Sequence, residues 1–103
     1  MYKVIDAAEA AKRTAEAEQK HAEKMWDEMK PAFFKRVADW TESRNWGLYI
    51  DSDDKMNQQS ILSYDPIRIY IIEELQKLSF EVNWDTSKKQ LQVSWEHLKG
   101  VVI

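Results

Sequence analysis

The chain has 103 residues, of which 44% are hydrophobic and 32% are charged, and this composition is typical of one small folded domain. A formal net charge of -3 disfavours nucleic acid as a partner, because phosphates require a basic face. The sequence has no cysteine, which excludes a disulfide, a thiolate zinc site and a thiol nucleophile, and no apolar run approaches the roughly 20 residues that cross a bilayer.

The first predicted element is a long alanine-rich helix that begins near Val4. Small or apolar residues recur at alternating spacings of four and three, which places them in a narrow stripe on one helix face. These residues are Val4, Ala8, Ala11, Ala15, Ala22, Met25 and Met29, and Glu18 is the one polar interruption. A stripe this narrow buries little area within its own chain, so it favours pairing with another helix.

We therefore predict that this helix mediates homo-oligomerisation or binds a partner. The residues expected at the contact are Ala8, Ala11, Ala15, Ala22, Met25, Trp26 and Met29. The alanines would let a partner backbone approach closely, and the larger side chains would add contact area at one end. The alternative is that the helix folds back onto the sheet of its own chain, and the sequence leaves both interpretations open.

Pro31 is expected to break or kink this helix near Met29, because proline removes a backbone donor and clashes with the preceding turn. The bulkier residues after Pro31 are expected to pack on the rest of the chain. The single domain, residues 1–103, would then comprise a projecting or pairing helix over 1–30 and a compact α+β part over 31–103. Gly47 is a candidate left-handed cap at the end of the helical pattern.

The elements expected after Gly47 are short. They are strands at 48–50 and 61–64, a helix at about 66–79, and a β-hairpin with strands at 80–84 and 91–95. Asp65 and Pro66 mark the helix start, since aspartate can act as N-cap and proline fits the first helical position. This order predicts an α+β fold with a small antiparallel sheet, a covering second helix, and the long first helix alongside or protruding.

The predicted hairpin holds a second candidate contact. Trp84 and Trp95 are expected to approach each other across it, with Lys88 and Lys89 in the turn between the strands. These four residues could contact a ligand or partner by stacking and charge. Ordinary solubilising lysines in a turn are the favoured interpretation of Lys88 and Lys89, because charges are balanced elsewhere in the chain.

The sequence offers little support for chemistry. The loop Asp51–Gln59 is expected to be solvated and the most mobile segment, and it lacks the glycine and glutamate positions of a calcium loop. His21 and His97 have no metal-ligand spacing beside them. No serine or threonine stands in a nucleophile motif. We therefore expect no metal, no cofactor, no catalytic residue and no enzymatic activity.

The arrangement resembles small accessory proteins of tailed bacteriophages, in which an Ala/Glu/Lys helix precedes a compact segment such as Glu73–Val82 and a strand such as Gln92–Trp95. The resemblance is one of pattern and spans most of the chain. It implies a viral protein in the host cytoplasm or the virion. The expected function is a non-catalytic homo-oligomeric protein that binds itself and a host or phage protein, and so blocks or sequesters a host factor or small ligand. The alternative is a virion structural or assembly component.

Overall fold

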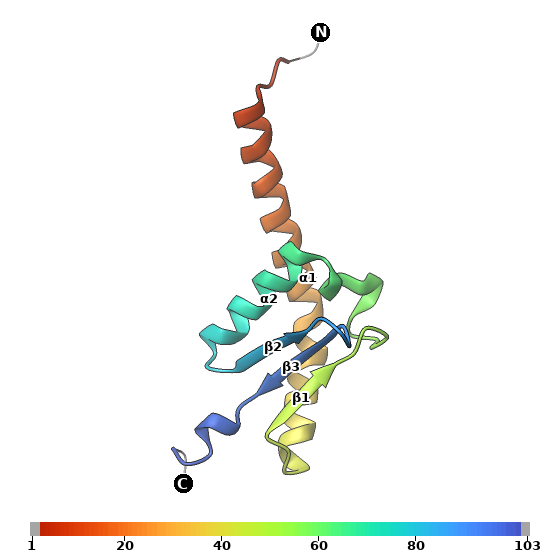
Figure 1. Ribbon diagram of the computed structural model, residues 1–103, viewed down its shortest axis with the longest axis vertical. Helices are drawn as coiled ribbons and strands as arrows, with labels where there is room; N and C mark the ends of the chain where they lie inside the picture. Colours follow the sequence, from red (N-terminus) through yellow and green to blue (C-terminus); the bar gives the residue numbers. More distant parts are fainter. Residues whose placement is uncertain (1–2, 102–103) are drawn as a thin grey trace.

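The computed structural model describes residues 3–101, with residues 58–60 described by their backbone. The elements in chain order are α1 (Ala7–Glu42), β1 (Gly47–Ile50), the 3-10 helix η1 (Gln58–Ser63), α2 (Asp65–Lys77), β2 (Glu81–Asp85), β3 (Gln90–Ser94) and the 3-10 helix η2 (Glu96–Leu98). The fold is α+β, as predicted. The molecule measures 64 × 29 × 26 Å because α1 extends well beyond the rest of the chain (Figure 1). None of the helices within 3–101 is both long enough and apolar enough to span a membrane.

The sheet is antiparallel with strand order β1-β3-β2. Its register aligns Leu48 with Val93 and Val93 with Val82, so these side chains share one face. That face is covered by α1 beneath β1 and by α2 beneath β2. The opposite face is polar and open, and there Asn83 donates a hydrogen bond to Gln92 at 3.0 Å. The β-hairpin predicted for the C-terminal part is confirmed.

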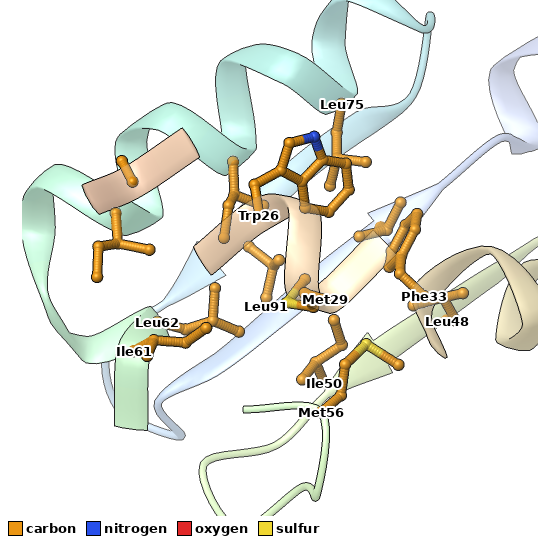
Figure 2. Close-up of a cluster of buried hydrophobic side chains, with 14 residues drawn as sticks. Trp26, Met29, Phe33, Leu48, Ile50, Met56, Ile61, Leu62, Leu75 and Leu91 are labelled. Atoms are coloured by element: carbon orange, nitrogen blue, oxygen red, sulfur yellow. The ribbon is translucent and has the colours of Figure 1, made fainter. Parts of the chain in front are cut away.

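The core lies between the two helices and the sheet (Figure 2). Its largest fully buried side chains are Phe33, Ile50, Leu62, Ile67, Ile71, Leu75, Leu91 and Val93. The Phe33 ring packs edge-on against Trp26 and Phe80, with centroid distances of 5.7 and 6.2 Å. Burial of each such side chain stabilises the fold by about 1.5–3 kcal/mol. The first residue of α1 in this core is Ala22, so the compact part begins there and not at residue 31.

Helix α1 begins at an aspartate cap, since the Asp6 carboxylate accepts a hydrogen bond from the Glu9 N–H at 2.8 Å. It then continues through Pro31, so the predicted break near Met29 is wrong. Met29 and Phe33, on either side of the proline, are both buried in the core. Packing of these residues outweighs a missing hydrogen bond at an exposed helix position.

Gly47 is not the left-handed cap of α1. Ser43 caps the helix, and the positive φ of 65° belongs to Arg44. Gly47 instead opens β1, where a Cβ atom would lie 2.9 Å from the carbonyl oxygen of Val93. Glycine is required at this position because β1 and β3 approach each other closely there. A left-handed backbone conformation is not the reason, since the φ of Gly47 is not positive.

Two further predictions near α2 are corrected. Residues 61–64 do not form a strand, because 61–63 belong to η1, where the Leu62 N–H donates to Asn57 Oδ1 at 2.9 Å. Asp65 is the first residue of α2 and not its cap; it pairs with Arg68 at 2.7 Å, and Tyr64 occupies the N-cap position. The predicted helix at about 66–79 is confirmed in place, with its end at Lys77.

Candidate interaction surfaces

The first candidate surface is the projecting segment, residues 7–21 of α1, which stands clear of the sheet and of α2 (Figure 1). All its residues are exposed except Glu9 and Glu18, which are half-buried. An ion pair between Arg13 and Glu9 at 2.9 Å adds only about 0.2–0.5 kcal/mol. A helix of about 15 residues is marginally stable in water when nothing packs on it. Because nearly all of its side chains are exposed, the projecting segment has no such packing from the described part of its own chain.

The structure divides the predicted contact residues of α1 into two groups. Ala8, Ala11 and Ala15 lie exposed in the projecting segment. In contrast, Ala22, Trp26 and Met29 are buried in the core, and Met25 packs partly buried against it. For these four residues the prediction of partner contact is corrected, because α2 and the sheet cover that length of α1.

The two tryptophans of the hairpin do not approach each other, so that prediction is wrong. The register places Trp84 opposite Leu91 near the turn, whereas Trp95 lies beyond the opposite end of the ladder. The Arg68 guanidinium stacks over the Trp84 ring at 4.8 Å from its centroid. Trp95 packs edge-on against Phe80 at 6.0 Å.

Lys88 and Lys89 are exposed in the turn between β2 and β3. The turn is closed by the Lys88 N–H, which donates to the Asp85 carboxylate at 3.0 Å, and by Lys89 with a φ of 50°. Because Trp84 and Trp95 stand at opposite ends of the hairpin, the four predicted residues do not form one contact patch.

A groove of about 540 Å³ runs beside α1 and was not predicted from the sequence. Its apolar lining includes Met25, Met29 and Met56, with Trp40 at one end. Methionine side chains are flexible and polarizable, so they suit a surface that accepts apolar groups of varied shape. Met56 could not be assigned from sequence, because it lies within a stretch of polar loop residues.

The rim of this groove holds a long-range ion pair between Arg36 and Asp54, with two N–O distances of 2.5 and 3.0 Å. The side chains are 26% and 15% exposed, and the Asp54 carboxylate also accepts the Met56 N–H at 3.0 Å. The hydrogen bond from Arg36 lowers the pKa of Asp54. This loop is therefore anchored to α1 and is less solvated than predicted from its composition.

Asp54→Asn is expected to lower the free energy of unfolding by about 1–3 kcal/mol at neutral pH, since it removes a charge-assisted pair from a partly buried position. The pKa of Asp54 is lower in the folded state than its ordinary 3.8, so this stabilisation is present above that pH and is lost as pH falls through the folded-state pKa. Urea denaturation at several pH values between about 7 and 2 measures the free energy of unfolding and its loss at low pH. Asp53→Asn, an exposed neighbour with the same charge change, is the control. Equal losses in the two variants would contradict the role of the pair.

The histidines stay apart in the structure: His21 is exposed on α1, and His97 Nδ1 lies 3.8 Å from a carboxylate oxygen of Glu81. Among residues 3–101, no three His, Cys, Asp or Glu side chains are grouped as they would be to hold a metal ion.

Comparison of the chain with protein-family models, with curated proteins and with solved structures gives no significant match.

Proposed function

We propose that this chain is a non-catalytic binding protein that self-associates through the projecting segment. The observation that carries the proposal is the exposure of Ala8, Ala11 and Ala15 on a helix that its own chain leaves without support. A second helix lying on these small residues would approach closely and stabilise both copies. Following the resemblance to phage accessory proteins, the proposed role is to bind and block, or sequester, a host factor in the host cytoplasm.

The charges on the stripe favour an antiparallel pair. In a parallel pair in register, Glu18 would face Glu18 of the second copy, and like charges in one layer are destabilising. In an antiparallel pair with Ala11 against Ala15 of the second copy, Glu18 meets Ala8 instead. The helix dipoles then also oppose each other. The two compact parts lie at opposite ends of such a pair, so they do not collide.

Ala15→Glu is expected to abolish self-association, because a carboxylate in the centre of the proposed contact would lose water without gaining a partner. Ala17→Glu is the matched control: it introduces the same side chain two residues away, at an exposed position on the opposite side of α1. Multi-angle light scattering should give a multiple of 12.2 kDa for the wild type and Ala17→Glu, and 12.2 kDa for Ala15→Glu. A monomeric wild type at high concentration, or an identical response of the two variants, would rule out the proposed contact.

The long helix also supports a second candidate, a virion structural or assembly component, because a helix extending from a molecule 64 Å long could dock between neighbouring subunits. The two candidates differ in where the protein is found after infection. A virion component copurifies with particles at a fixed ratio, whereas a binder of a host factor stays in the soluble lysate. Quantitative mass spectrometry of both fractions separates them.

A further inference from the structure

The outer edge of β2 has no strand neighbour among residues 3–101, because β2 pairs only with β3. In an antiparallel ladder, alternate residues direct their N–H and C=O groups away from the paired strand. No hydrogen bond with another segment of the described chain uses these outward groups of β2. Such an edge can accept an extended segment of another protein as an additional strand.

Helix α2 packs against β2 beside this edge. Arg68 lies over Trp84 of β2, and Ile72 and Gln76 follow it at intervals of four residues on the same side of the helix. Ile69, which neighbours Ile72 on the outer side, is 52% exposed. A hollow of about 510 Å³ lined by Gln76 and Val82, among others, opens at the start of β2. A strand added beside β2 would therefore place alternate side chains over Ile69 and Ile72.

The charges of β2 favour one class of partner strand over another. Glu81 and Asp85 stand at the two ends of the strand on the open face, with Asn83 between them. Two β2 strands paired antiparallel about Asn83 would set Glu81 against Asp85 of the second copy, and facing like charges are destabilising. The same carboxylates would favour a strand with lysine or arginine opposite each of them.

We propose that the outer edge of β2 binds an extended basic segment of a partner protein by strand addition. The segment carries Lys or Arg at two positions four residues apart, facing Glu81 and Asp85. The residues at the second and fourth positions of this five-residue core are β-branched and lie over Ile69 and Ile72. The inference rests on the proposed binding function and names its partner class, but it does not depend on self-association through α1.

The test uses two peptides with blocked ends, Lys-Val-Thr-Val-Lys and Glu-Val-Thr-Val-Glu. Each is titrated into the full chain and into the Ala15→Glu variant while amide chemical shifts are recorded. The basic peptide should give saturable shifts at β2 and an affinity about tenfold higher than the acidic peptide, in both proteins. Equal binding in both proteins would show that the edge acts independently of α1, so failure of one proposal is distinguishable from failure of the other.

Two pairs of variants locate the contact. Glu81→Lys should weaken binding of the basic peptide about threefold or more, and Glu73→Lys, with the same charge change at an exposed position of α2, should not. Ile69→Ser should weaken binding of both peptides, and Ile5→Ser, at a 40% exposed isoleucine before α1, should not. Equal affinities for the two peptides, shifts that avoid β2, or pairing of β2 with a second copy would each overturn the proposal.

Discussion

Phe33→Ala is expected to lower the free energy of unfolding by about 3–5 kcal/mol. The side chain is fully buried, and its ring contacts Trp26, Phe34 and Phe80 in edge-on geometry. Truncation removes the favourable free energy of burying the ring. It also leaves a cavity where α1 meets the sheet, next to Phe80 at the start of β2. Because small domains are stable by only about 5–15 kcal/mol, this single change removes a large part of the total.

The neighbouring residue supplies the control for this prediction. Phe34 carries the same side chain on the same helix but is 38% exposed, so Phe34→Ala should cost about 1 kcal/mol. Phe33→Leu, which keeps most of the volume, should cost less than about 1.5 kcal/mol and provides a folded variant if the alanine variant unfolds. Urea denaturation of all three checks the order. Similar losses at Phe33 and Phe34 would mean that α1 presents a different face to the sheet.

Elements set by local pattern were predictable. The period-two runs at 80–84 and 91–95 predicted β2 and β3, because alternation over five residues fits a half-covered strand and little else. The pair Asp65-Pro66 located the start of α2 to within one residue, since proline is favoured in the first turn of a helix. In both cases the determining interactions lie within a few residues of one another.

Features set by particular side-chain contacts were not predictable. The segment 61–64 fits a strand or a helical turn equally well. The side chain of Asn57, a residue that is 3% exposed, favours η1 because it accepts a hydrogen bond from the Leu62 N–H. Arg36 and Asp54 are 18 residues apart, and no spacing rule connects them. The Trp84–Trp95 error arose from register, since the ladder sets Glu81 opposite Ser94 and carries Trp95 past its end.

The alanine stripe shows a further limit of sequence patterns. One spacing of four and three, broken only by Glu18, runs from Ala8 to Met29, yet its first half is exposed and its second half lies in or against the core. Periodicity identifies the face of a helix that can be covered, but what covers it depends on where α2 packs. The exposed half is therefore the part on which the proposal of self-association rests.

Pro31→Ala is expected to raise the free energy of unfolding by about 1–3 kcal/mol. Proline inside a helix costs about 3 kcal/mol relative to alanine, because it removes the donor for the carbonyl four residues earlier, that of Asp27, and its ring crowds that carbonyl. Part of the gain is offset by about 0.4–1 kcal/mol, since an unfolded chain without proline has more conformational freedom. Pro31 is exposed, so the change removes no core contact.

Pro31→Gly is a second test of the cost of the proline. Glycine restores the backbone donor but is about 1 kcal/mol worse than alanine inside a helix, so this variant should lie between the wild type and Pro31→Ala. Urea denaturation gives the order, and slower exchange of the new amide at position 31 would show that its hydrogen bond forms. A less stable alanine variant would mean that Met29 and Phe33 reach the core only because proline sets the local helix geometry. In that case Pro31 would have a positive role in packing α1 onto the rest of the compact part.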